Sequence, residues 1–140
     1  MKKLVLLIVL MHGGAVSAQS ETQAIKATLE DYLEGSSYNN PEQIVSAFYE
    51  GADLFLHKKD EELFIMSPAE YAALFAKREK GTFNGREGTI LHIDYDVDIA
   101  TAKVAIFIPK PNLRFIDIFL LKKLGGKWKI VSKAATLIKE

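Results

Sequence analysis

The chain has 140 residues, about the length of one domain, of which 49% are hydrophobic and 26% are charged. This composition is that of a globular protein, and the absence of cysteine excludes a disulfide scaffold, an iron–sulfur cluster and a thiolate zinc site. The 18 basic residues balance 18 acidic ones, so the net charge gives no argument for binding nucleic acid or an anionic membrane.

The segment 1–18 has the pattern of a secretory signal peptide. A basic start at Met1–Lys3 precedes an unbroken apolar run at Leu4–Met11, and small residues follow at Val16–Ala18. The run is too short to cross a bilayer, which takes about 20 apolar residues. We therefore predict cleavage at the end of this segment, export to a bacterial periplasm or to the medium, and a single mature domain at 19–140 that is not membrane-associated.

The next part of the chain predicts three helices. Capping boxes at Ser20–Gln23 and Ser67–Glu70 begin the first and the third helix, and Asn40–Pro41 begins the second. The three helices are expected to end, in this order, at Gly35–Tyr38, Gly51–Asp53 and Gly81.

Strands make up the rest of the predicted structure. Two short strands flank a charged link and form a small hairpin, and from Arg86 onward tight turns join four longer strands into an antiparallel meander. The predicted strands are Leu54–His57, Leu63–Met66, Gly88–Tyr95, Ile99–Ile108, Leu113–Leu124 and Lys127–Leu137. No linker or repeat divides the chain, so the fold class is α+β, with the helices before the meander.

The two-residue hairpins fix the register of the meander, and with it the face toward which each side chain points. One face is nearly all apolar and should lie under the helices. It carries Asp117, placed between Val104 and Ala134, and it also carries Leu91. Lys133 falls on the opposite, outer face. A single bulge would exchange the faces from that point onward, and one such bulge turns Lys133 inward to pair with Asp117.

The outer face of the predicted sheet carries an apolar cluster. An exposed apolar patch on a sheet usually marks an interface, so we predict a homodimer joined through this face. The alternative is a twisted sheet that is partly covered by its own termini. The residues of the cluster are Ile116, Ile118, Leu120 and Val131.

Four stretches of the sequence, 36–41, 48–50, 115–123 and 126–133, resemble the family described as "putative lumazine-binding", within the nuclear-transport-factor-like (SnoaL-like) superfamily. The resemblance extends over roughly Glu21 to Leu137. It implies a cone-shaped fold in which three N-terminal helices pack on a strongly curved antiparallel sheet, with an internal pocket and commonly a dimer. The superfamily includes isomerases, dehydratases, cyclases, binding modules and assembly domains, so this fold does not determine the function.

Asp117 is the first candidate for chemistry, because it is the one ionisable residue on the predicted inner face. A carboxyl buried among apolar side chains can act as a general acid or base, and the alternatives are ligand contact or a structural role. His57 is either its partner in proton transfer or an exposed hairpin histidine. The other predicted pocket residues are Tyr32, Phe48, Phe55, Tyr71, Phe75, Val104, Phe119, Trp128 and Ser132.

These patterns predict an exported, dimeric protein that binds a small, mostly apolar or aromatic ligand in its pocket. One alternative is an isomerase- or dehydratase-like enzyme that uses Asp117 as general acid or base, and another is a non-catalytic dimerisation or assembly module. No histidine has a metal-ligand spacing and no cofactor motif occurs, so we expect neither a metal nor a cofactor. The identity of the ligand and whether a reaction is catalysed are left open.

Overall fold

The computed structural model describes residues 13–138 and begins with one long helix. Helix α1 (Gly13–Ser37) has 25 residues and runs without a break through the capping box predicted at Ser20–Gln23. The helix does not begin at Ser20, because extending a helix by further turns costs far less than nucleating one. The apolar run of the predicted signal peptide, Leu4–Met11, lies outside the described residues.

Two short helices follow, and each is capped as the sequence predicts. The side chain of Asn40 caps α2 (Pro41–Ala47) by accepting a hydrogen bond from a backbone amide of its first turn. Ser67 and Glu70 form a complete capping box at the start of α3 (Pro68–Ala73).

Helix α3 ends at Ala73, several residues before the stop predicted at Gly81. The amides of Leu74 and Phe75 bind carbonyl oxygens three residues back, at 3.1 and 3.0 Å, so the chain continues in tight turns. These turns bury Phe75 and leave Leu74 exposed. The prediction of one regular helix as far as Gly81 is therefore wrong beyond Ala73.

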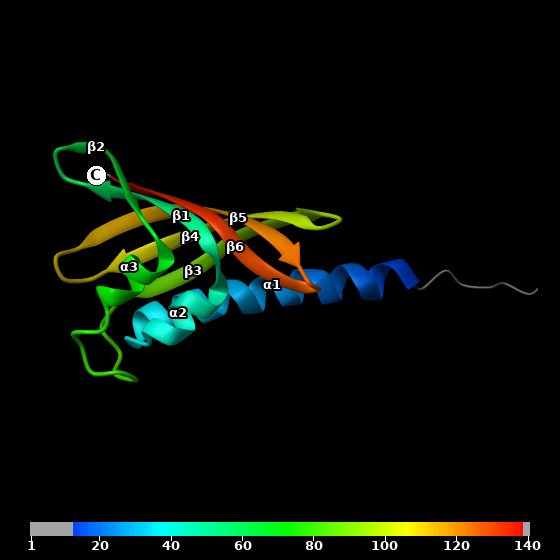
Figure 1. Ribbon diagram of the computed structural model, residues 1–140, viewed down its shortest axis with the longest axis horizontal. Helices are drawn as coiled ribbons and strands as arrows, with labels where there is room; N and C mark the ends of the chain where they lie inside the picture. The colour runs from blue at the N-terminus through cyan, green and yellow to red at the C-terminus, as the bar shows by residue number, and fades with distance from the viewer. Residues whose placement is uncertain (1–12, 139–140) are drawn as a thin grey trace, which may run out of the picture.

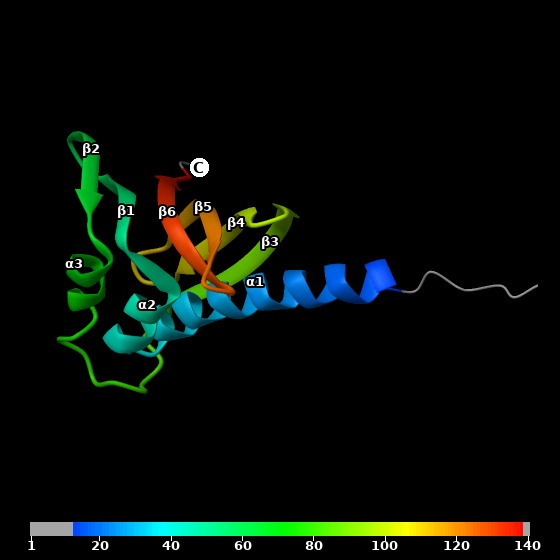
Figure 2. The same cartoon turned by 45° about the vertical axis from the view of Figure 1, so that its right-hand side comes forward.

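Six strands form one sheet with the order β2-β1-β6-β5-β4-β3. Strands β1 and β6 are parallel, and the other neighbours are antiparallel. The sheet curves over α1, and α2 and α3 lie toward one end of it (Figures 1 and 2). The strands are β1 (Phe48–Lys58), β2 (Glu61–Met66), β3 (Glu87–Asp96), β4 (Ile99–Ile108), β5 (Leu113–Leu124) and β6 (Lys127–Leu137).

Strand β1 begins earlier than the sequence predicts. Residues 48–53 were expected to end the second helix, but Phe48 pairs with Ile130 of β6 and the strand starts directly after α2. Phe48, Ala52 and Leu54 are buried on the side of the core. Pairing with β6 thus overrides the local helical pattern, because it buries these apolar side chains and satisfies their backbone groups.

The three hairpin turns of the meander lie where the sequence predicts them. Their closing pairs are Asp96 with Ile99, Ile108 with Leu113 and Leu124 with Lys127. The α+β class and the predicted pairing of Val104 with Asp117 are therefore confirmed. The inner face of the sheet packs on α1 in one core, which includes Ile25, Leu29, Tyr32, Val104, Phe119, Leu121, Trp128 and Ile130.

A bulge in β3 changes one part of the predicted register. Ile90 pairs with Val104 and His92 pairs with Lys103, which leaves Leu91 unpaired between them. The prediction that Leu91 points inward is therefore wrong: its side chain is exposed, and Ile90 packs against the core instead. The extra residue exchanges the two faces beyond the bulge.

A second bulge, in β6, has a larger effect on the inner face. Leu121 pairs with Ile130 and Leu120 pairs with Ser132, so Val131 is the extra residue. Beyond it Asp117 pairs with Ala135 rather than with Ala134. The outward placement of Lys133 is therefore wrong, and its side chain is buried beneath the sheet, only 2% exposed.

The outer face of the sheet carries an apolar surface, here called the outer patch, made of Ile116, Ile118, Leu120 and Val131. Ile118 and Leu120 are 48% and 45% exposed, and the other two residues are half-buried. The patch thus lies on the side of the sheet away from the helices. Within residues 13–138, no helix is both long and apolar enough to cross a membrane.

Gly35 allows α1 and α2 to pack closely, and we expect Gly35→Ala to destabilise the fold. A Cβ atom there would lie 2.8 Å from the backbone nitrogen of Ile44 and 3.2 Å from the carbonyl oxygen of Asn40. Overpacking costs about 1–3 kcal/mol, which exceeds the gain in helix propensity of at most about 1 kcal/mol. Urea denaturation should show a net loss of up to about 2 kcal/mol, whereas exposed Thr22→Ala should change stability by less than about 0.5 kcal/mol.

Candidate functional site

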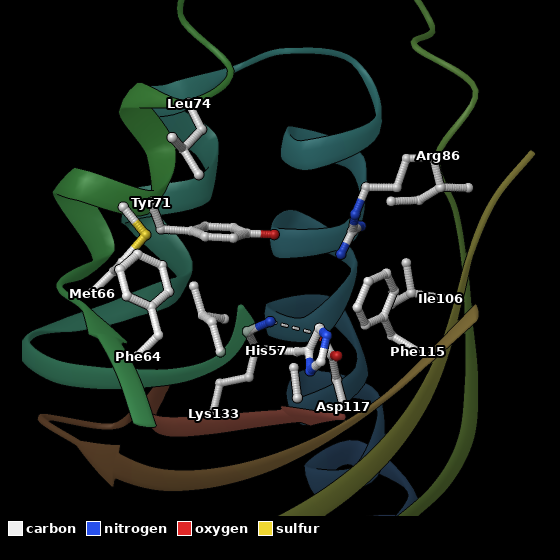
Figure 3. Close-up of a pocket in the computed structure, with 13 residues that line it drawn as sticks. His57, Phe64, Met66, Tyr71, Leu74, Arg86, Ile106, Phe115, Asp117 and Lys133 are labelled. Carbon is white, nitrogen blue, oxygen red and sulfur yellow. Dashed lines mark hydrogen bonds and ion pairs between the residues drawn. The ribbon is translucent and has the colours of Figure 1, made fainter. Parts of the chain in front are cut away.

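A cavity of about 240 Å³ lies between α3 and the open end of the curved sheet (Figure 3). Most of its wall is apolar, and one region of it carries charged and hydroxyl groups. The apolar lining residues are Leu56, Phe64, Met66, Leu74, Ile106, Ile108, Phe115 and Ala135, and the polar ones are His57, Tyr71, Arg86, Asp117 and Lys133.

The polar lining residues come from five separate parts of the chain, one of which is β1 with His57. Asp117 lies on β5, and the bulge in β6 places Lys133 on the same side of the sheet. Tyr71 projects from α3, and Arg86 comes from the residue just before β3. In Figure 3, Tyr71 and Arg86 approach from opposite sides of the cavity, with Asp117 and Lys133 below them.

Asp117 and Lys133 form a buried ion pair. Lys133 Nζ lies 2.8 Å from Asp117 Oδ2, and both side chains are 3% exposed or less. The hydroxyl of Tyr32 donates a longer hydrogen bond, of 3.4 Å, to the same carboxylate oxygen. The ammonium group also lies 5.4 and 5.2 Å from the ring centres of Tyr32 and Tyr71, within the range of cation–π attraction.

Arg86 extends this network toward α1. Its guanidinium donates to Tyr32 Oη at 2.9 Å and to Ser36 Oγ at 2.6 Å. Its backbone carbonyl accepts a hydrogen bond from the Ser37 hydroxyl at 2.7 Å. The Tyr32 and Tyr71 hydroxyls lie 3.1 Å apart, so the network is continuous from Ser36 to Lys133.

The environment shifts the pKa values of Tyr32 and Tyr71 in opposite directions. Burial raises the pKa of Tyr32 well above its usual value. Burial acts in the same direction on Tyr71, but the positive charges of Arg86 and Lys133, with the hydrogen bond between the two tyrosine hydroxyls, outweigh it and lower the Tyr71 pKa. Of the two tyrosines, Tyr71 is the one that lines the cavity.

Of the residues predicted to form the site, Asp117, His57 and Tyr71 line the cavity. Within the described part of the chain, His57 forms no hydrogen bond with Asp117, and its ring packs near the ring of Phe115 at 6.4 Å. Tyr32 lies behind the wall and contacts the cavity through Asp117 and Tyr71. The other predicted pocket residues do not line the cavity: Phe48, Phe75, Val104, Phe119 and Trp128 are buried in the core, and Phe55 and Ser132 are half-buried.

Arg86 is the site residue that sequence reasoning missed, and Lys133 was foreseen there only as the consequence of a bulge. Arg86 lies just before a strand and after a glycine-containing loop, a position that carries no periodic signal. Its burial depends on Ser36 and Tyr32, which are about fifty residues away in the sequence. Among residues 13–138, no group of three or more His, Cys, Asp or Glu side chains is placed to hold a metal ion.

The fold and this cavity define a cone-shaped α+β protein of the NTF2-like (SnoaL-like) superfamily. The chain belongs to the family described as "Putative lumazine-binding", whose model matches residues 20–134. A search of curated proteins found no match.

Solved structures show the same fold. An NTF2-like protein of unknown function from Shewanella baltica is 25% identical, with a TM-score of 0.75, over 87% of this chain and 97% of that chain. Another from Methylobacillus flagellatus is 26% identical, with a TM-score of 0.73, over 86% and 94%. A ketosteroid isomerase-like protein from Erwinia carotovora atroseptica is 14% identical, with a TM-score of 0.62, over 86% and 98%, and shows likeness of fold alone.

Proposed function

We propose that the protein binds a small organic molecule in the cavity between α3 and the sheet. The observation that carries this proposal is the division of the cavity wall into a large apolar part and one cluster of polar groups, which is the usual composition of ligand sites. A volume of about 240 Å³ suits a ligand of one or two rings. The family description, which names a small-molecule ligand, supports the same class of function.

One contact favours a second candidate, an isomerase- or dehydratase-like enzyme. Lys133 is a titratable group 2.8 Å from Asp117, and both line one cavity. In such an enzyme Asp117 would move a proton while the Tyr71 hydroxyl polarised a carbonyl group. Binding has the stronger support, because Oδ2 of Asp117 is already occupied by Lys133 and Tyr32 and the side chain is 2% exposed.

Filling the cavity tests the proposed function. Ala135 lines the cavity on β6, so Ala135→Phe should weaken the binding of a neutral aromatic probe, 2-naphthamide, at least tenfold in calorimetric titration. Ala73→Phe adds the same side chain to an exposed position of α3 outside the cavity wall and should leave the affinity unchanged. Equal affinities of the two variants, both folded by circular dichroism, would contradict binding in this cavity.

The chemical fate of small molecules that purify with the protein separates the two candidate functions. Under the binding proposal, small molecules that purify with the protein are recovered chemically unchanged after long incubation. Conversion of such a molecule by the wild type, abolished by Asp117→Asn, would support the enzyme instead.

We further propose that the protein is exported and works as a homodimer joined through the outer patch. The signal-peptide pattern of segment 1–18 supports export. The exposure of Ile118 and Leu120 on the side of the sheet away from the helices supports the interface.

A further inference from the structure

The charged groups of the cavity wall do not balance. Among the described residues that line it, Arg86 and Lys133 are positive and Asp117 is negative. Lys133 and Asp117 form an ion pair, and among the described residues Arg86 forms no ion pair of its own. Arg86 is 7% exposed, and a cation removed from water in this way carries a substantial desolvation cost.

Among the described residues, the hydrogen bonds of the Arg86 side chain are with neutral hydroxyl oxygens. A guanidinium carries five N–H donors, and within the described part of the chain the Arg86 side chain donates one hydrogen bond to Ser36 and one to Tyr32. Donors therefore remain for a ligand at the cavity wall. The fork of a guanidinium matches the two oxygens of a carboxylate better than it matches a single carbonyl oxygen.

Two further observations indicate positive potential in the same place. A neighbouring depression shares Tyr71, Leu74, Arg86 and Ile108 with the cavity and adds Arg78 and Lys110, with no acidic residue among the described residues that line it. The lowered pKa of Tyr71 agrees with an excess of positive charge here, because the charges of Arg86 and Lys133 outweigh the effect of burial on that hydroxyl.

We propose that the cavity selects an organic monoanion, a carboxylate on an apolar body of one or two rings, and that the carboxylate binds Arg86 and the Tyr71 hydroxyl beside Lys133 (Figure 3). The apolar body then lies against side chains such as Phe64, Met66 and Phe115. This inference rests on the proposed binding function and adds the chemical class of the ligand. A bound carboxylate supplies the negative charge that the protein itself does not provide.

A pair of probes of equal shape tests the inference. 2-Naphthoate is ionised at pH 7 and 2-naphthamide is neutral, so the ratio of their affinities isolates the charge. We expect the wild type to bind 2-naphthoate at least tenfold more tightly in calorimetric titration. Arg86→Gln should bring this ratio close to one, and Asp117→Asn should raise it at least threefold, because it removes the negative charge that competes with the ligand.

A matched control and the wild-type ratio keep the test decisive. Lys59→Gln removes one positive charge from the exposed β1–β2 turn and should not change the ratio. If Arg86→Gln does not fold, the wild-type ratio and the opposite effect of Asp117→Asn still test the proposal. A wild-type ratio near one, or a ratio that Asp117→Asn lowers, would overturn the inference that the cavity selects an anion. Binding of 2-naphthamide to the same protein would still support the proposed binding function. Failure of both probes to bind the wild type would overturn the proposed function and this inference together.

Discussion

Replacing Lys133 by methionine should lower the free energy of unfolding by about 3–5 kcal/mol, the usual cost of removing one partner of a buried ion pair. The carboxylate of Asp117 is 2% exposed and would keep only the hydrogen bond of 3.4 Å from Tyr32. Methionine matches the volume of the lysine chain, so the loss arises from the stranded charge rather than from a void. Urea denaturation monitored by the fluorescence of Trp128 measures it.

The double variant Lys133→Met/Asp117→Leu separates the charge effect from packing. Replacing both partners removes the stranded charge, so we expect most of the lost stability to return. Lys127→Met removes an exposed ammonium from the same strand and should change stability by less than about 0.5 kcal/mol. A double variant as unstable as the single one would show that Asp117 is not held mainly by Lys133.

Ile118→Glu should convert the proposed dimer to a monomer at micromolar concentration, as measured by sedimentation velocity. Ile118 is 48% exposed at the middle of β5, and a carboxylate there would bring two like charges together across a symmetric interface. The side chain points away from the core, so the fold of each protomer should persist.

Leu63→Glu is the matched control for the interface. Leu63 is 64% exposed on β2, which is an edge strand of the sheet, and lies outside the outer patch. This variant should sediment like the wild type. A wild-type protein that is monomeric at micromolar concentration would refute the interface, and it would leave the fold and the cavity as described.

Local patterns predicted much of this fold. Asn40 and Ser67 marked the starts of α2 and α3, and Gly125–Gly126 marked the last hairpin, because caps and tight turns depend on a few adjacent residues. Asp117 could be placed on the inner face by counting back from that hairpin and across β4. Such counting holds as long as a strand alternates regularly.

Features that depend on distant partners could not be predicted in the same way. Phe48 belongs to β1 because β6, some eighty residues later, pairs with it. The burial of Arg86 depends on hydroxyl groups of α1. The bulge at Val131 could not be located from the sequence: the alternation of polar and apolar residues over Lys127–Ile130 stops at Val131, but a valine on the outer face suits a regular strand equally well. The positions of Arg86 and Lys133 in the cavity wall therefore became evident only from the structure.

The bulge at Val131 reverses which side chains of β6 point inward along the rest of the strand. Before it, the even-numbered residues Trp128 and Ile130 face the helices, and after it the odd-numbered Lys133 and Ala135 do so. One strand thus contributes packed core at one end and a cation to the ligand cavity at the other. In evolution, moving this one-residue offset along β6 would turn a different set of β6 side chains toward the helices. The chemistry of the cavity would then change because other residues face it, without any substitution among the residues that line it now.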